Sequence, residues 1–242
     1  MEAITQNWKL LLSVRGVLIS MLITFGLLAV SSLIFPDLLP FGLFEFWALK
    51  GSLMEAILIS YPAYLFGMGL NAFYLFRTYN NYTETPTEIL LTGIGISVRA
   101  GVLEEVLFRW LIFLSATLFL PVLDWLLLGF MGLNVIEWVY VGVMCPVANF
   151  FTLGLLKQFL LHSTRWSIGA ALISANSRFR DGHSYQGIMG FTVSWFMGMY
   201  FFWLMFTYGL VAAILVHFIY DFLIFLVVWT DAVIERRMRR QQ

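Results

Sequence analysis

Ionisable side chains occur in three segments that are otherwise apolar, at spacings that suit shared chemistry. A charged side chain at the middle of a membrane costs about 2.5–3.5 kcal/mol on insertion scales, so each one needs a stabilising partner or a function. Carboxylates and imidazoles are the groups that act as general bases, hold water or bind metal ions. The residues concerned are Glu104, Glu105 and Arg109 in the first segment, His183 in the second, and His217 and Asp221 in the third.

The spacing in the first segment separates the two glutamates. If the segment is an α-helix, Arg109 lies about 40° around the helix from Glu105 but about 140° from Glu104. Glu105 is therefore the expected ion-pair partner of Arg109, in a supporting role. Glu104 is the candidate for a chemical role, either as a general base or as a member of a proton pathway.

The histidines differ in their surroundings. His217 and Asp221 stand four residues apart and share one face of an apolar helix, where they can grip a water, a metal ion or a substrate, or act as a polar clamp between helices. His183 follows Gly182 in the run Phe-Arg-Asp-Gly-His, which suits either a catalytic or an interfacial residue. His162 lies in a polar turn and is expected to be solvated.

The composition excludes a soluble protein. Of the 242 residues, 61% are hydrophobic, 18% are aromatic and only 12% are charged, whereas soluble domains are about 45–50% apolar and about 25% charged. The net charge of zero provides no positive field that would attract nucleic acid. Cys145 is the only cysteine, which excludes an internal disulfide and a cysteine metal cluster.

Apolar segments of about membrane-spanning length follow one another along the whole chain. They predict an all-α, polytopic transmembrane helix bundle of about eight spans around a buried polar active site. Pro62 is expected to kink the second span, while Glu55 and Asp124 are expected near span ends, in contact with water. The segments lie at about 17–35, 52–76, 89–120, 121–133, 135–161, 166–176, 187–207 and 209–229.

Taken in order, the three polar groups resemble the signature of the CAAX protease and bacteriocin-processing family of intramembrane endopeptidases. That family shows the patterns Glu-Glu-x-x-x-Arg, Phe-x-x-x-His and His-x-x-x-Asn or Asp. Here the patterns read Glu104-Glu105-x-x-x-Arg109, Phe179-x-x-x-His183 and His217-x-x-x-Asp221. The separation between the first two is longer than is usual in the family, which suggests an inserted helical hairpin at about 121–165.

The resemblance implies a catalytic mechanism and a class of substrate. Glu104 would be the general base that activates water with help from His183, and His217 and Asp221 would position the scissile carbonyl or stabilise its oxyanion. A metal-independent mechanism is expected, with zinc held by His183, His217 and Glu104 as the alternative. The substrate would be a protein or peptide with a membrane-embedded or lipidated segment, and membrane lipids would surround the protein.

The resemblance also suggests how the chain is organised. Residues 1–87 would be N-terminal transmembrane helices with a polar loop, residues 88–230 the catalytic bundle, and residues 231–242 a basic tail. Both termini are expected in the cytoplasm, because arginines occur at 236, 237, 239 and 240 and the N-terminal end carries Lys9 and Arg15. The membrane is expected to be the plasma membrane of the cell. The first apolar segment is expected to be retained as a span.

Two other functions fit the same residues. A proton-coupled transporter also keeps acids and histidines within the membrane, and it would have discontinuous helices in matching halves. A non-catalytic membrane adaptor or bacteriocin-immunity protein could retain the fold, but it would have no need for Glu104, His183 and His217 together.

Overall fold

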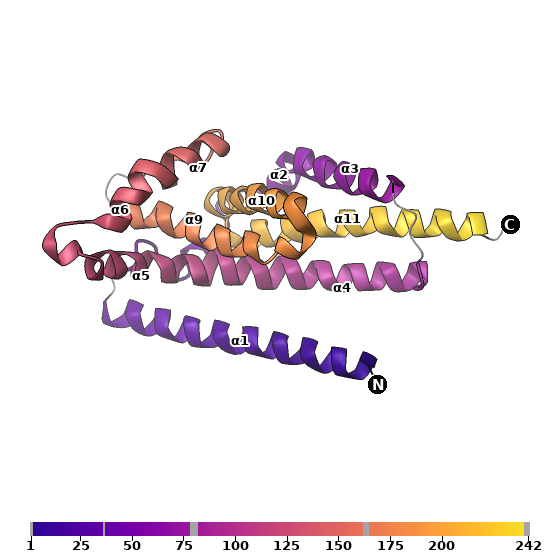
Figure 1. The fold of residues 1–242 in the computed structure, drawn as a ribbon, viewed down its shortest axis with the longest axis horizontal. Coiled ribbons are helices and arrows are strands. Elements are labelled where there is room, and N and C mark those ends of the chain that lie inside the picture. Colours follow the sequence, from indigo (N-terminus) through magenta and orange to yellow (C-terminus); the bar gives the residue numbers. More distant parts are fainter. Residues whose placement is uncertain (1, 36, 78–81, 162–164, 240–242) are drawn as a thin grey trace. The chain divides into compact units, whose positions relative to one another are not determined.

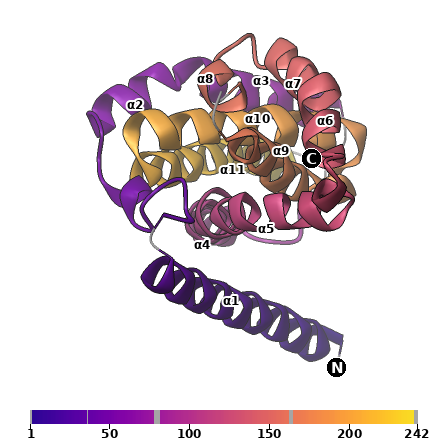
Figure 2. The same cartoon turned by 90° about the vertical axis from the view of Figure 1, so that its left-hand side faces the viewer.

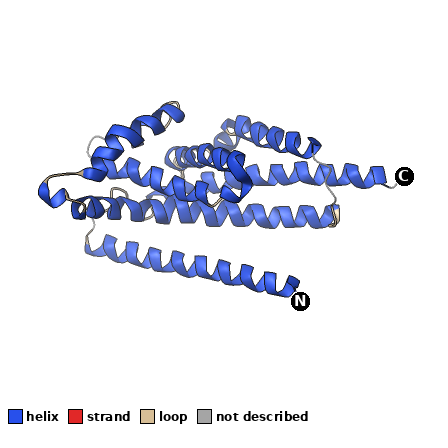
Figure 3. Ribbon diagram, viewed as in Figure 1, coloured by secondary structure: helices blue, strands red, loops and turns tan. Residues whose placement is uncertain are grey.

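The computed structural model describes residues 2–35, 37–77, 82–161 and 165–239, and in these residues the regular structure is helical throughout (Figure 3). The predicted all-α class is therefore confirmed. The chain divides into two compact units, and each is described by itself. The first unit comprises Met1–Glu45 and Leu107–Ser184, and the second comprises Phe46–Val106 and Tyr185–Gln242.

In the first unit, α9 makes its largest contact with α5. Figure 1 shows α5 beside it, and α8 also packs against it. The Tyr140 hydroxyl donates to the backbone oxygen of Leu160 and lies against Gly169, where a Cβ atom would collide with it. The helices of this unit are α1 (Glu2–Ile34), α5 (Phe113–Leu126), α6 (Val135–Val139), η4 (Tyr140–Met144), α7 (Cys145–Phe151), α8 (Lys157–Leu160) and α9 (Trp166–Asp181).

In the second unit, α11 is the central helix. It packs against α4, α3, α10 and α2, and Figure 2 shows α2 beside α10 as well. The helices are α2 (Leu53–Ile59), α3 (Tyr61–Arg77), α4 (Pro86–Glu104), α10 (Gly187–Tyr208) and α11 (Leu210–Arg239). Gly209 turns the chain between α10 and α11 with a φ of +99°, next to the backbone oxygen of Ala48, so a side chain is excluded there.

A stripe of small residues on α4 brings that helix close to α11. Gly93, Ser97 and Gly101 are spaced by four and are all buried. A Cβ atom at Gly93 would lie 2.7 Å from that of Phe225, and one at Gly101 would lie 3.0 Å from the backbone oxygen of Ile214. The two helices therefore run antiparallel with their backbones nearly in contact, as small residues permit in membranes.

Polar groups tie together the far end of this helix pair. Thr85 and Glu88 form a capping box at the start of α4. The Tyr82 hydroxyl donates to Asp231 at 2.7 Å, and Arg236 donates to the backbone oxygen of Glu84 at 2.8 Å. The start of α4 is thus held against the last turns of α11.

Four helical stretches among the described residues are long and apolar enough to cross a membrane. They are Arg15–Ile34, Pro86–Leu126, Ser184–Tyr208 and Leu210–Arg239. Helices α2 and α3 would form a fifth span if they cross together, bent by 46° beside Pro62, where a kink was predicted. A membrane-spanning composition is therefore supported, but with four or five spans in place of about eight.

The difference in span number arises in the middle of the chain. Pro121 was expected to begin a new segment, but it lies inside α5, which belongs to a continuous helical run of 41 residues, Pro86–Leu126. Proline is tolerated in apolar helices when neighbouring groups satisfy the freed backbone. The next apolar helical run, Val135–Phe151, is shorter than the roughly 20 residues that a bilayer requires.

Asp124 was expected to reach water, and this expectation is wrong. The residue is 5% exposed, and its carboxylate accepts hydrogen bonds from the backbone nitrogens of Ile136 at 2.6 Å and Glu137 at 3.4 Å. It therefore binds the first turn of α6, whose N–H groups have no partner within the helix. Glu55, in contrast, is exposed as predicted and accepts a hydrogen bond from Tyr208 at 3.2 Å.

We predict that Gly101→Leu lowers the melting temperature in detergent, because the new side chain has to push α11 away from α4 at a cost of about 1–3 kcal/mol. Gly95→Leu is the matched control, since it lies on the same helix and a Cβ there meets nothing within 4 Å. Both substitutions raise helix propensity equally. Equal melting temperatures for the two variants would show that the close approach of α4 and α11 is not required for stability.

Candidate functional site

The second unit brings four of the predicted site residues together at the end of α4. Glu104 ends this helix, Glu105 begins the following π-helix η2 (Glu105–Ile112), and His217 and Asp221 come from α11. We call these four residues the histidine–carboxylate cluster. Their approach depends on the small-residue stripe, because Gly101 lies one turn before Glu105 and contacts the backbone of α11.

Glu105 holds the imidazole of His217. The side chains of Glu105 and His217 are 0% and 5% exposed, and 2.7 Å separates the Glu105 Oε1 and His217 Nδ1 atoms. A carboxylate can only accept a hydrogen bond, so Nδ1 carries the hydrogen and donates it. In the neutral ring this leaves Nε2 as the nitrogen that can accept a proton.

The other two carboxylates face this Nε2 atom. Asp221 Oδ2 lies 3.6 Å from it and Glu104 Oε2 lies 4.0 Å from it. Both distances are too long for a direct hydrogen bond, and they are separations across which a water molecule can bridge polar groups. Glu104 is also the more accessible of the two glutamates, with 30% of its side chain exposed. The cluster can therefore hold and deprotonate a water molecule.

Phe201 of α10 fixes the plane of the His217 ring. The two rings are stacked, with centroids 4.4 Å apart and planes inclined by 19°. Phe201 is itself buried and makes an edge contact with Tyr220. Together with the bond to Glu105, this stacking leaves the imidazole little freedom to rotate, which directs Nε2 toward Glu104 and Asp221.

The first unit contains a second cluster, formed by Arg109, Phe179 and His183, which we call the arginine–phenylalanine cluster. The guanidinium carbon of Arg109 lies 3.9 Å from the centre of the Phe179 ring, a cation–π contact. Arg109 is fully buried. Phe108 packs against the same phenylalanine with ring centres 5.6 Å apart.

His183 is anchored by the same phenylalanine. Its Nδ1 lies 2.8 Å from the backbone oxygen of Phe179, and the two rings are 4.7 Å apart. A carbonyl oxygen only accepts, so Nδ1 donates the hydrogen of this bond. The bond also satisfies a carbonyl in the last turn of α9. The spacing Phe-x-x-x-His thus follows from one helical turn.

The π-helix η2 changes the geometry expected for Arg109. Its hydrogen bonds run from residue i to i+5, so that each residue turns through a smaller angle than in an α-helix. The angles of 40° and 140° were calculated for an α-helix, so they do not apply to η2. They therefore no longer identify Glu105 as the helical neighbour of Arg109. π-Helical turns of this kind are frequent at functional sites.

The structure thus assembles the predicted residues in two groups. Glu104, Glu105, His217 and Asp221 lie together in one unit, and Arg109 and His183 share Phe179 in the other. The ion pair between Glu105 and Arg109 remains a prediction. His162 lies outside the described residues.

The zinc alternative gains no geometric support. In the part of the chain that the structure describes, no group of three or more histidine, cysteine, aspartate or glutamate side chains is arranged to hold a metal ion. The set suggested by the sequence, His183, His217 and Glu104, is drawn from both units.

Two buried residues near the clusters were not anticipated. Phe201 has no sequence signal, because a phenylalanine among many others in an apolar helix looks like packing. Asn176 is fully buried on α9, one turn before Phe179. An asparagine in an apolar helix is a polar signal that could have been noticed, since burying an amide requires a hydrogen-bond partner.

We predict that Glu105→Gln lowers stability more than Glu104→Gln does. Glu105 is fully buried and bonded to His217, and the neutral amide oxygen of glutamine accepts a hydrogen bond only about half as strongly as a carboxylate does. Glu104 is partly exposed and is separated from His217 by 4.0 Å. Thermal unfolding of both variants in one detergent measures the difference, and identical unfolding curves would contradict the supporting role of Glu105.

Comparisons of the chain with protein-family models, with curated proteins and with solved structures give no match.

Proposed function

We propose that the protein is an intramembrane endopeptidase in which Glu104 activates the water that cleaves a peptide bond. The observation that carries this proposal is the position of His217 between Glu105, which holds its Nδ1, and the pair Glu104 and Asp221, which face its Nε2. A helix pair of membrane-spanning composition provides these groups, and burying ionisable groups there without a function would be costly.

The proposed reaction begins with a water molecule held by Glu104, Asp221 and His217. Glu104 takes a proton from the water as the oxygen attacks the carbonyl carbon of the peptide bond, which generates a tetrahedral oxyanion. Collapse of this intermediate breaks the carbon–nitrogen bond, and the proton on Glu104 passes to the departing amine. The products are a carboxylic acid and an amine, so water is the only co-reactant.

His217 and Asp221 position the carbonyl or stabilise its oxyanion in this scheme. Because Glu105 and Phe201 hold the imidazole before substrate arrives, its reorientation does not add to the barrier. His183, whose Nδ1 donates to the backbone oxygen of Phe179, belongs to the other unit, so the assistance to Glu104 that the family resemblance implies stays a prediction. Arg109 has a supporting role, and its guanidinium contacts the Phe179 ring.

The substrate class follows from where the catalytic groups lie. A site on apolar helices selects peptides that themselves enter the membrane, so we propose a protein or peptide with a membrane-embedded or lipidated segment. The exposed apolar side chains on the candidate spans would be covered by membrane lipids.

A proton-coupled transporter is the second candidate, and one observation favours it. Helices α2 and α3 form a bent pair of the kind that marks broken spans in transporters. In that case Glu104, His217 and Asp221 would exchange protons with a pathway across the membrane. The two functions differ in a measurable product, because only the endopeptidase releases new peptide termini.

We predict that Glu104→Gln reduces peptide cleavage by at least about a hundred-fold, since general-base catalysis contributes that much or more. A substrate is first identified by comparing membrane peptides from cells with and without the active protein, and cleavage by the purified protein is then followed by mass spectrometry. Glu55→Gln is the control, because Glu55 is an exposed carboxylate of the same unit outside the cluster.

Two further arms of this experiment test the alternatives. Cleavage should persist after chelation, and loss of cleavage that zinc restores would contradict the metal-independent mechanism. If the Glu104→Gln protein cleaves at the parent rate, the water-activating role fails. Proton flux into vesicles that disappears in this variant, in the absence of any cleavage, would support the transporter.

We also predict that four spans cross the membrane, so that both termini lie in the cytoplasm of a cell whose plasma membrane contains the protein. The last turn of α11 carries Arg236, Arg237 and Arg239, and such residues are enriched on the cytoplasmic side. Single cysteines engineered at either end of a Cys145→Ser background should resist an impermeant thiol reagent in intact cells and react after permeabilisation. Labelling of the C-terminus from outside would reverse the orientation.

A further inference from the structure

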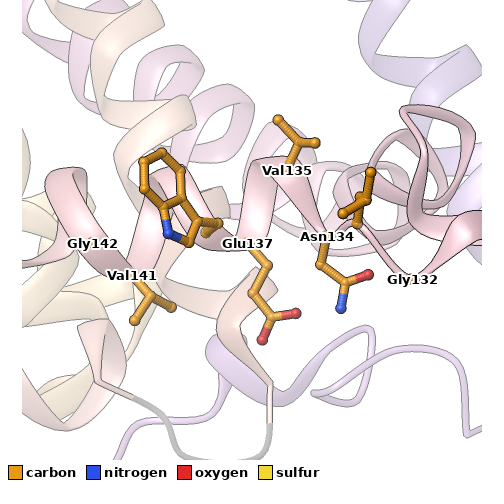
Figure 4. A pocket seen from close by; sticks show the side chains of 8 residues that line it. Gly132, Asn134, Val135, Glu137, Val141 and Gly142 are labelled. Carbon is orange, nitrogen blue, oxygen red and sulfur yellow. The ribbon is translucent and has the colours of Figure 1, made fainter.

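A pocket of about 730 Å³ lies beside the turn that follows α5, in the first unit. Figure 4 shows its lining side chains. None of the residues assigned to catalysis belongs to it. The lining residues are Gly132, Leu133, Asn134, Val135, Glu137, Trp138, Val141 and Gly142.

The wall of this pocket is held in place before any ligand binds. The buried carboxylate of Asp124 accepts from the backbone nitrogens of Ile136 and Glu137, which ties the first turn of α6 to α5. A Cβ atom at Gly129 would lie 2.7 Å from the backbone oxygen of Asp124, so the intervening turn is packed against the same point.

The chemistry of the lining selects a cation. Glu137 is the only charged residue in its lining. The side chains of Glu137 and Asn134 extend to the same side (Figure 4). Their oxygens are acceptors, while Leu133, Val135 and Val141 provide exposed apolar surface beside them.

The pocket also lies where lipid headgroups are expected. The candidate span Pro86–Leu126 ends eight residues before Asn134. Exposed aromatic rings surround this end: Trp125 packs on Phe130 with ring centres 6.0 Å apart, and Trp138 is 71% exposed. Tryptophan and other aromatic residues of this kind concentrate at the boundary between hydrocarbon and water.

We propose that this pocket binds the headgroup of an aminophospholipid, with the primary ammonium on Glu137 and Asn134. A primary ammonium donates three hydrogen bonds, which these oxygens can accept. A quaternary ammonium donates none and is recognised by cages of several aromatic rings, whereas this lining holds only Trp138. Trp138 and the aliphatic residues contact the apolar part of the same lipid.

The experiment measures binding of short-chain lipids to delipidated full-length protein by native mass spectrometry. The probes are dioctanoyl phosphatidylethanolamine, phosphatidylcholine and phosphatidylglycerol. We expect the parent protein to prefer phosphatidylethanolamine over phosphatidylcholine by about tenfold, the equivalent of one charge-assisted hydrogen bond. Glu137→Gln should abolish this preference.

Asp37→Asn is the matched control, because Asp37 is an exposed acid of the same unit that follows the candidate span ending at Ile34. This variant should keep the preference, and all three proteins should melt at the same temperature. Any of three results would overturn the proposal. The first is equal binding of phosphatidylethanolamine and phosphatidylcholine by the parent, the second is a preference that survives Glu137→Gln, and the third is strongest binding of phosphatidylglycerol. Because no residue of the histidine–carboxylate cluster is involved, the result is independent of the proposed peptidase activity.

Discussion

The close contact between α4 and α11 is the constraint on which the candidate site depends. Gly93, Ser97 and Gly101 have little or no side chain, so the two backbones approach until Gly101 meets the backbone of α11. At that separation Glu105 reaches His217 with a hydrogen bond of 2.7 Å. Larger residues in the stripe would hold the helices apart, and the carboxylate of Glu105 would then be buried without the imidazole that offsets the cost of its desolvation.

Both described histidines are anchored in the same way. His217 donates its Nδ1 hydrogen to the carboxylate of Glu105, and His183 donates the corresponding hydrogen to the backbone oxygen of Phe179. In each case a neighbouring phenylalanine limits the ring's rotation. A histidine held at one nitrogen presents the other in a defined protonation state, which is what proton transfer requires whether the function is hydrolysis or transport.

Asp124 and Glu104 are both carboxylates on apolar helices, but they have different kinds of partner. Asp124 binds backbone nitrogens at the start of α6 and is explained by local structure. Glu104, at the end of α4, faces the Nε2 atom of His217 across a gap that suits water. The contrast shows that an acid on an apolar helix is informative only once its partners are known, because backbone N–H groups and an imidazole can both occupy its acceptor atoms.

Much of the fold could be predicted from the sequence, because apolar periodicity and length report on helices directly. The last two apolar segments, expected at 187–207 and 209–229, correspond to α10 and α11, and the kink at Pro62 was found. The pairing of His217 with Asp221 also followed from spacing along one helix. The span number did not, since Pro121 lies within a helix that local rules would end. Only tertiary packing assigned Glu105 to His217 and gave Phe201 its role, because these residues are distant in sequence and become neighbours where α4, α10 and α11 meet.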